Sequence, residues 1–505
     1  MTKPFYITTA ISYPNGRPHV GHAYEAIATD AIARWRRLEG RPVRFLTGTD
    51  EHGLKMAQAA RARGLTPRQL ADEMSASFKA MADQLTISYD RFIRTTDADH
   101  YAASAELWRR MAANGDIYLG RYEGWYSVRD EAFYGEEELI AGAVGERLSP
   151  QGTPVEWTVE ESWFFRLSAY QDRLLAHYAA HPDFIQPEAR RNEVIRFVEG
   201  GLADLSISRT SFDWGVPVPD SPGHVMYVWV DALTNYLTGA GWPADPALAE
   251  RWWPADIHII GKDIVRFHAV YWPAFLMAAG VALPKAVFGH GFLLNRGEKM
   301  SKSTGNVIDP AAMAERYGVD GLRYFLLREV SFGQDGSYSD DAIVTRINAD
   351  LANGLGNLAQ RCLSIIAKQC AGRVPAPGTA SGPDLGGLAA RIGQAMDALQ
   401  LNRALEIVWE GVSEANRWFA DQAPWALRKT DPAAADAVLY ATAEAVRQLA
   451  ILVRWAIPGA ADALLDQLGQ AEDARDLAAL AVPLTPGIAL PPPQGVFPRL
   501  EPAPA

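Results

Sequence analysis

The chain has 505 residues, 48% of them hydrophobic, and its 48 Lys and Arg are outnumbered by 60 Asp and Glu, for a formal net charge of −12. A single hydrophobic core does not usually extend over a chain of this length, so we expect about two to four domains. No uninterrupted apolar run reaches the roughly 18 residues of a membrane span, and the N-terminus lacks the apolar stretch of a signal peptide. We therefore expect neither a membrane nor a secreted protein, and the net charge opposes nucleic-acid binding except through local contacts.

The first elements predicted along the chain form a β-α-β unit. Phe5–Thr9 is rich in β-branched and aromatic residues, which predicts a strand, and Val43–Thr47 predicts the next one. Between them a helical period of apolar residues predicts a helix that begins at His19 and ends before Gly40.

His19 and His22 lie side by side on the first turn of this helix, where backbone N–H groups lack helical partners. The start of a helix is a favourable place for an anion, and Gly21 between the histidines leaves room for a nucleotide to approach the backbone. Two ordinary capping histidines are the alternative interpretation.

The α/β pattern is interrupted over 116–225 by short aromatic strands, acidic loops and a helix over 170–179. A second α/β half follows, with strands predicted at Ile257–Ile260 and Ala286–Gly289 and a helix from Ile264 to Ala279. Two such halves predict a doubly wound parallel Rossmann-type sheet that binds ligands at the carboxyl ends of its strands. We assign 1–115 and 226–309 to this catalytic domain and 116–225 to an inserted connective domain.

The second part of the chain is predicted to be helical. Residues 310–340 form a junction, and 341–480 are Ala- and Leu-rich with helical periodicity, which predicts a C-terminal helix bundle and an α/β plus α fold class. The tail, 481–505, is proline-rich and predicted to be extended. Cys362 and Cys370 lie about 12 Å apart on a predicted helix, beyond disulfide reach, which fits a reducing cytoplasm.

Lys299 and Lys302 stand in a polar, glycine-containing segment that is unsuited to a core. Such a loop can move its lysines onto a phosphate chain and away again, although a merely solvated charged loop is the alternative. Together with the histidine pair, the segment indicates an enzyme that activates a carboxylate with ATP by holding the triphosphate from both sides.

This combination of motifs resembles the class I aminoacyl-tRNA synthetases. The resemblance implies that His19, His22, Lys299 and Lys302 stabilise the pentacoordinate α-phosphate and the leaving pyrophosphate of ATP, which arrives with Mg²⁺. That role is electrostatic stabilisation of a transition state, and it requires no covalent enzyme intermediate.

The resemblance sharpens to the methionyl-tRNA synthetases and covers nearly the whole chain. The motifs that carry it lie at 10–13, 49–53, 227–232 and 261–268, besides the lysine segment. Asp50 ends a predicted strand and can pair with an α-ammonium, and a thioether sulfur packs well on aromatic rings, although an aromatic helical stripe is also typical of plain core. The methionine pocket implied by the family consists of Ile11, Tyr13, Asp50, Trp229, Ala232, Tyr236, Ile264 and His268. The ATP site implied by the family adds Gly21, Gly261 and Asp263, with Asp263 on the ribose.

The helical part carries a second implied site. Asn357 and Arg361 lie one helical turn apart, and Trp425 begins another predicted helix after a proline. In the family these positions read the CAU anticodon of tRNA(Met), the initiator tRNA included, by contacting splayed bases. A polar residue inside a helix and a core tryptophan are the alternatives. A monomer is favoured because the chain shows no extra C-terminal module.

The chain departs from many family members at the zinc knuckle of the insertion. Ser127 and Asp130 stand where a Cys-x-x-Cys pair is expected, and no cysteine precedes Cys362. Tetrahedral structural zinc needs four soft or imidazole ligands, so we expect no zinc. Hydrogen bonds would then hold the knuckle, with Arg129 pairing Asp130 or a nearby Glu.

The function expected from this sequence is that of a cytoplasmic methionine–tRNA ligase. A leucine, isoleucine or valine synthetase is one alternative, but those usually carry a much longer insertion with an editing site. A tRNA-binding paralogue without activity is the other, and it would be free to lose His19, His22, Asp50 and Lys302, all of which are present.

Overall fold

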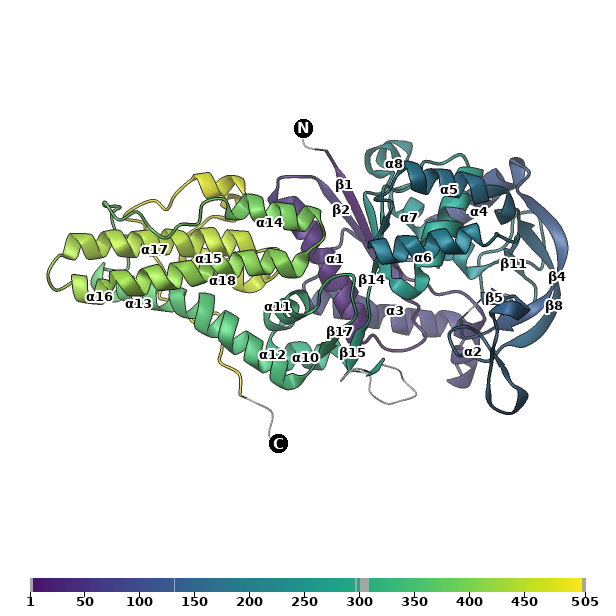
Figure 1. Ribbon diagram of the computed structural model, residues 1–505, viewed down its shortest axis with the longest axis horizontal. Helices are drawn as coiled ribbons and strands as arrows, with labels where there is room; N and C mark the ends of the chain where they lie inside the picture. The colour runs from purple at the N-terminus through teal and green to yellow at the C-terminus, as the bar shows by residue number, and fades with distance from the viewer. Residues whose placement is uncertain (1–2, 131, 296–297, 300–307, 502–505) are drawn as a thin grey trace.

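The computed structural model describes residues 3–501 apart from 131, 296–297 and 300–307. Figure 1 shows a helix bundle at one end, a helix-covered sheet in the middle and a second, inserted sheet at the other end. The predicted α/β plus α fold class is confirmed.

The central sheet has six strands in the order β3-β2-β1-β13-β14-β9, and all its pairings are parallel. Ile7 of β1 lies opposite Phe45 on one side and Ile257 on the other, so the two α/β halves meet at β1. Ligands bind beyond the carboxyl ends of strands where such an order reverses. The strands are β1 (Phe5–Thr9), β2 (Val43–Thr49), β3 (Arg91–Arg94), β9 (Ile185–Gln186), β13 (Ile257–Gly261) and β14 (Val287–His290). β9 belongs to the range predicted as insertion, yet it is an edge strand of this sheet.

Helices connect and cover these strands. Ile27, Ile32 and Trp35 of α1 are buried against the sheet and the C-terminal helices, as the apolar period predicts. The covering helices are α1 (Val20–Leu38), α2 (Leu54–Ala62), α3 (Pro67–Gln84), α4 (Ala98–Ala113), α7 (Val228–Gly239), α8 (Pro246–Trp252) and α9 (Trp272–Ala278).

The helix predicted from Ile264 to Ala279 is irregular in the structure. A 3-10 turn (Lys262–Ile264) and a π-helical turn (Phe267–Tyr271) precede α9. Pro273 has no N–H to donate to the carbonyl of Ala269, one turn earlier. The Tyr178 hydroxyl donates to that carbonyl instead, at 2.6 Å, so the backbone remains satisfied without regular helix.

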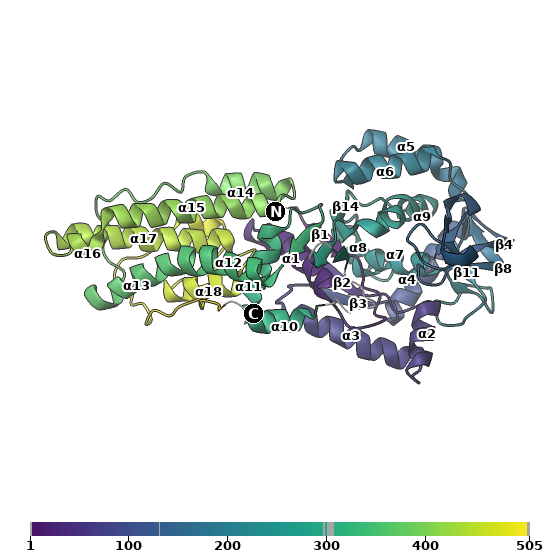
Figure 2. The same cartoon turned by 60° about the horizontal axis from the view of Figure 1, so that its bottom comes forward.

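The insertion is built on two long antiparallel strands, β4 (Ile117–Ser127) and β8 (Glu156–Phe165). Two helices beside them, α5 (Gln171–Ala180) and α6 (Glu188–Glu199), pack together (Figure 2). The short strands are β5 (Ala132–Tyr134), β6 (Ile140–Ala141), β7 (Arg147–Leu148), β10 (Leu205–Ser206), β11 (Ser208–Arg209) and β12 (Val225–Met226).

The C-terminal helices pack on the central sheet through a buried ion pair. Arg323 lies 2.6 Å from Asp30 of α1, both fully buried, and its Nε donates to the Ala456 carbonyl. The elements after β14 are β15 (Leu293–Asn295), β16 (Glu298–Lys299), α10 (Pro310–Tyr317), α11 (Val319–Glu329), β17 (Gly336–Tyr338), α12 (Asp340–Arg346), a π-helix (Ile347–Gly356), α13 (Asn357–Gln369), α14 (Leu388–Asp397), α15 (Leu401–Gln422), α16 (Pro424–Leu427), α17 (Pro432–Val453) and α18 (Pro458–Gln467).

The tail lacks regular structure but packs along the bundle, where Leu500 N–H donates to Asn348 Oδ1 at 2.9 Å. Cys362 and Cys370 are free cysteines. Among the described helices, none combines the length and apolar character needed to span a bilayer.

Candidate active site

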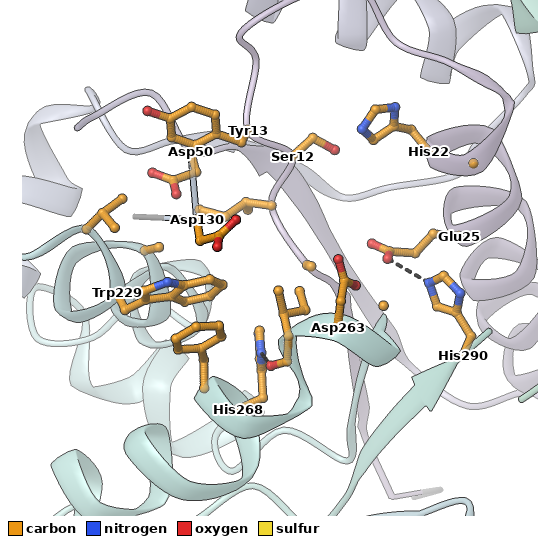
Figure 3. Close-up of a pocket in the computed structure, with 18 of the residues that line it drawn as sticks. Ser12, Tyr13, His22, Glu25, Asp50, Asp130, Trp229, Asp263, His268 and His290 are labelled. Atoms are coloured by element: carbon orange, nitrogen blue, oxygen red, sulfur yellow. Dashed lines mark hydrogen bonds and ion pairs between the residues drawn. The ribbon is translucent and has the colours of Figure 1, made fainter. Parts of the chain in front are cut away.

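A cavity of about 450 Å³ opens beyond the carboxyl ends of β1, β13 and β14, where the strand order reverses (Figure 3). That volume suits a small ligand. The structure brings these predicted residues together in its lining: Ile11, Tyr13, His19, Gly21, His22, Asp50, Trp229, Ala232, Tyr236, Gly261, Asp263, Ile264 and His268. Lys299 lies in β16, and Lys302 lies outside the described residues.

The two histidines cap α1 and also line the cavity. His19 Nδ1 accepts the Gly21 N–H at 3.1 Å, and His22 Nδ1 accepts the His19 N–H at 3.1 Å. Because a backbone N–H can only donate, each Nδ1 is an acceptor, and the ring proton of each neutral imidazole is on Nε2. Helix capping thus uses Nδ1 of each ring as an acceptor and leaves Nε2 as an N–H donor. A phosphate oxygen, which accepts hydrogen bonds, requires such a donor.

Gly21 is required by the packing of the first histidine. A Cβ at this position would lie 2.8 Å from Cε1 of His19, which is closer than side chains pack. The sequence-based reason was room for a nucleotide, whereas the structure shows that the glycine first of all makes room for the His19 ring.

One wall of the cavity is aromatic. Trp229 of α7 stacks on Phe267 with ring centroids 3.8 Å apart and an interplanar angle of 5°. Phe267 was missed by the sequence analysis, although it lies between Ile264 and His268 in a motif already singled out. The stack makes a flat, polarizable surface suited to an apolar or sulfur-containing side chain.

Tyr236 and His268 form a hydrogen-bonded pair in the same wall. His268 Nδ1 lies 3.0 Å from the Ile264 carbonyl, so Nδ1 carries the proton, and Nε2 accepts from the Tyr236 hydroxyl at 2.6 Å. Burial lowers the pKa of His268 to about 4, against a weaker opposing effect of the Ile264 carbonyl. The imidazole is therefore neutral at physiological pH, and this wall carries no charge.

Asp50 follows the carboxyl end of β2 and is 8% exposed. Its N–H donates to the Ser12 carbonyl at 2.9 Å, which holds the residue beside the segment that carries Ile11 and Tyr13. The Tyr13 hydroxyl accepts the Met56 N–H at 3.0 Å, and Lys55 lies over the Tyr13 ring. The Asp50 carboxylate thus stands at the part of the cavity that Ile11 and Tyr13 line, where it can bind a cationic group.

Another acidic residue of the lining, Glu25, is tied to a histidine that sequence reasoning missed. His290 Nε2 lies 2.8 Å from a Glu25 carboxylate oxygen, and both residues line the cavity (Figure 3). Burial alone would lower the pKa of His290, but the Glu25 carboxylate outweighs it and raises the pKa above its usual value. The sequence signal for His290 is its place as a polar residue at the end of β14. Its pairing with Glu25 on α1 was not predictable from spacing.

The described residues on both sides of the lysine segment lie beside the cavity. Leu293, at the start of β15, is part of the lining, and the Ile308 carbonyl accepts the Val20 N–H at 3.1 Å, next to the histidine pair. Of the described residues on the two sides of the segment, Leu293 thus lies at the cavity and Ile308 at the start of α1.

Comparison with known proteins decides the family. The family model described as "tRNA synthetases class I (M)" matches residues 5–363. The family model described as "Anticodon binding domain of methionyl tRNA ligase" matches residues 376–503. The methionine–tRNA ligase of Mycobacterium tuberculosis is 63% identical, with 99% of this chain and 98% of the relative covered. That of Brucella suis biovar 1 is 62% identical, with 98% of each covered. The chain belongs to the class I methionyl-tRNA synthetases.

Solved structures of this family superpose closely on the chain. A Mycobacterium tuberculosis methionyl-tRNA synthetase in complex with methionyl-adenylate matches with a TM-score of 0.96 at 63% identity, covering 99% of this chain and 100% of that one. The apo form from the same organism matches with a TM-score of 0.89 at 59% identity, covering 99% of each chain.

In this methionyl-tRNA synthetase the knuckle positions carry a hydrogen-bonded cluster of oxygen atoms. Asp130 Oδ2 accepts from Ser149 at 2.6 Å and from Thr153 at 2.5 Å, and Ser127 Oγ lies 2.6 Å from the Thr153 hydroxyl. Ser149 and Thr153 were missed by the sequence analysis, because nothing but folding brings them to Ser127 and Asp130. The expected pairing of Arg129 with Asp130 or a nearby Glu is not among the ion pairs of the described residues, and hydroxyl groups bind the Asp130 carboxylate instead.

The cluster gives a test of the expected absence of zinc. Within the described residues no three His, Cys, Asp or Glu side chains lie close enough to hold a metal ion. We expect elemental analysis of the purified protein to show no stoichiometric zinc, and a chelator to leave the melting temperature unchanged. One tightly held zinc per chain would contradict the interpretation of Ser127 and Asp130 as positions that no longer bind metal.

α16, which carries Trp425, lies at the end of the bundle farthest from the central sheet (Figure 1), and it contacts α13, which carries Asn357 and Arg361. The Arg361 guanidinium lies 5.0 Å from the Trp425 ring centroid and 5.1 Å from that of Phe419. Trp425 is 42% exposed, so it is not a core residue, and Asn357 is exposed one turn before Arg361. Phe419 was missed; its ring supports Trp425 edge to face.

Proposed function

We propose that the cavity binds L-methionine at its aromatic end and Mg·ATP at its histidine end. As a methionine–tRNA ligase, the chain joins the amino acid to ATP to form methionyl-adenylate and diphosphate, and then transfers the methionyl group to the 3′-terminal adenosine of tRNA(Met). The observation that carries the proposal is one cavity with a carboxylate, a neutral aromatic wall and two N–H-presenting histidines in its lining.

At the methionine end, Asp50 pairs with the α-ammonium. The uncharged wall of Trp229, Phe267 and the Tyr236–His268 pair contacts the thioether, whose sulfur interacts favourably with aromatic rings. The remaining proposed contacts are those of Ile11, Tyr13, Ala232 and Ile264.

At the ATP end, the Nε2–H groups of His19 and His22 donate to phosphate oxygens, and Asp263 binds the ribose beside Gly261. A methionine carboxylate oxygen attacks the α-phosphorus, and diphosphate leaves. Lys299 and Lys302 neutralise the charge that grows on the leaving group, which selectively stabilises the transition state.

The helix bundle is proposed to read the CAU anticodon. Trp425 stacks on a splayed base while Arg361, held over the tryptophan ring, and Asn357 contact base edges. Acidic groups dominate the chain, so these local contacts and not net charge supply recognition.

Trp425→Ala is expected to remove stacking worth about 1–3 kcal/mol, so kcat/KM for tRNA should fall about 10- to 100-fold. Trp425→Phe keeps a stacking ring and should retain most of the activity. Methionine-dependent ATP–diphosphate exchange should be unchanged, because the tryptophan lies at the far end of the bundle. Changing the CAU anticodon of the tRNA should lower kcat/KM of the wild type by a larger factor than it lowers kcat/KM of Trp425→Ala.

Val482→Ala provides the control, since Val482 is an exposed apolar side chain of the bundle region that has no proposed role. If Trp425→Ala depresses exchange and aminoacylation equally, the tryptophan is a structural residue and its assignment to the anticodon must be dropped.

The proposal also assigns a role to each domain of the chain. Residues 1–115 and 226–309 carry out catalysis, 116–225 form the zinc-free connective domain, 310–340 join it to the anticodon-binding domain at 341–480, and 481–505 form the tail. We further propose a cytoplasmic monomer, because the reaction serves translation and one chain contains both the cavity and the anticodon surface.

The proposed function is tested with purified protein in methionine-dependent ATP–diphosphate exchange and in charging of elongator and initiator tRNA(Met). We expect exchange with methionine, none of comparable efficiency with leucine, isoleucine or valine, and charging of both tRNAs. Exchange with one of those amino acids instead would indicate a different specificity, and no exchange with any amino acid would indicate an inactive paralogue.

A further inference from the structure

Three buried polar side chains lie behind the aromatic wall of the cavity. The Asp231 carboxylate binds His52 Nδ1 through one oxygen and His100 Nε2 through the other, each at 2.6 Å. All three side chains are at most 1% exposed, and none of them lines the cavity. Helical geometry turns Asp231 away from Trp229 and Ala232, toward α4, which packs on α7.

The hydrogen bonds of this group centre on the Asp231 carboxylate. The Thr238 hydroxyl donates to the Thr234 carbonyl, so its oxygen accepts from His100 Nδ1 at 3.1 Å. Burial raises the pKa of Asp231, but His52 and His100 outweigh that effect and bring it down to about 2, so the carboxylate is ionised at physiological pH.

The network joins the two parts of the chain that carry the proposed methionine contacts. His52 is two residues from Asp50, and Asp231 lies between Trp229 and Ala232. On its other side, His52 Nε2 lies 2.9 Å from the hydroxyl of Tyr101 on α4. The distance between the carboxylate of Asp50 and the aromatic wall thus depends on hydrogen bonds that run behind the cavity.

The residue between Asp50 and His52 anchors the same loop in another direction. Glu51 is fully buried and binds Arg94 at 2.7 Å, at the end of β3, while its carbonyl accepts from Trp214 Nε1 at 2.6 Å. Glu51 therefore ties the loop to the sheet and the insertion, and His52 ties it to α7. Hydrogen bonds and ion pairs are directional, so they restrict this loop to one position more strictly than apolar packing alone would.

We propose that Asp231, together with His52 and His100, is a positioning residue for methionine: it holds α7, and with it Trp229, at a fixed position relative to Asp50. The inference rests on the proposed function, which assigns Asp50 and Trp229 to the amino acid. It goes beyond that proposal because the network touches neither substrate and acts only through the two segments that do.

The test is Asp231→Asn in methionine-dependent ATP–diphosphate exchange, with methionine and ATP varied separately. We expect KM for methionine to rise about tenfold or more, while KM for ATP and kcat stay within about threefold of wild type. His100→Gln in the same chain should recover part of the loss, because the Gln carbonyl can accept the amide N–H that Asp231→Asn introduces opposite His100.

Asp320→Asn is the matched control, since Asp320 is a half-buried carboxylate that accepts the Ala460 N–H at the start of α18, away from the cavity. If Asp231→Asn lowers the melting temperature as this control does but leaves KM for methionine within about twofold, the network is purely structural and the proposal is overturned. If Asp231→Asn does not fold, Tyr101→Phe removes only the hydroxyl on His52, and an unchanged KM for methionine overturns the proposal.

Asp50→Asn separates this inference from the proposed function. A raised KM for methionine in Asp50→Asn with an unchanged one in Asp231→Asn rejects the positioning role alone. An unchanged KM in Asp50→Asn rejects the assignment of the methionine site, and with it the basis of the inference.

Discussion

Asp50→Ala is expected to raise KM for methionine about 100- to 4,000-fold, because removing one partner of a buried ion pair costs about 3–5 kcal/mol and each 1.4 kcal/mol is about a tenfold change. Asp50 is 8% exposed at the end of β2, so water does not easily replace its carboxylate. KM for ATP should change little, since the proposed phosphate contacts come from His19 and His22. The measurement is ATP–diphosphate exchange with each substrate varied in turn.

Glu73→Gln is the control for this substitution. Its carboxylate is exposed and pairs with Arg63 on the surface, an interaction worth little to stability or binding. It should leave both KM values unchanged. A methionine KM near the wild-type value in Asp50→Ala would move Asp50 out of the amino-acid site, whereas an equal rise in both KM values would indicate a general loss of structure.

Lys302→Ala is expected to slow adenylate formation about 100-fold or more, the usual effect of losing a charge aimed at a transition state. The residue lies outside the described residues, but the chain on either side, at Leu293 and Ile308, lies at the cavity and at the start of α1. Methionine affinity should hardly change, because the lysine acts on the phosphate chain. Equilibrium dialysis with labelled methionine provides a binding measurement that does not depend on catalysis.

Lys79→Ala is the matched control, since Lys79 is an exposed lysine paired with Asp83 on the surface of α3. An adenylation rate in Lys302→Ala within about threefold of wild type would remove the residue from the catalytic group. A parallel loss of methionine binding would show instead that the lysine shapes the amino-acid site.

The local sequence was sufficient wherever a feature depends on residues close together in the chain. The strand, turn and helix around His19 and His22 follow from residue type and period, and so does the i,i+4 spacing of Asn357 and Arg361. Backbone geometry enforces such neighbours whatever the rest of the chain does. The fold class followed from the order of these elements, because alternating strands and helices leave few ways to build a sheet.

Contacts between distant segments were decided only by tertiary packing. Glu25 meets His290, and Asp130 meets Ser149 and Thr153, because separate elements converge there, and no periodicity carries that information. The same holds for His52, whose role behind the cavity depends on Asp231, far along the chain on α7.

Helix irregularity near the cavity has the same origin. Pro273 predicts that a hydrogen bond is lost, but the sequence does not say whether the helix ends, kinks or continues. In the structure the Tyr178 hydroxyl of α5, in the insertion, donates to the Ala269 carbonyl in place of the missing N–H, and a π-helical turn precedes α9. That turn carries Phe267 and His268 into the aromatic wall, so the shape of the amino-acid site depends on a side chain from another part of the fold.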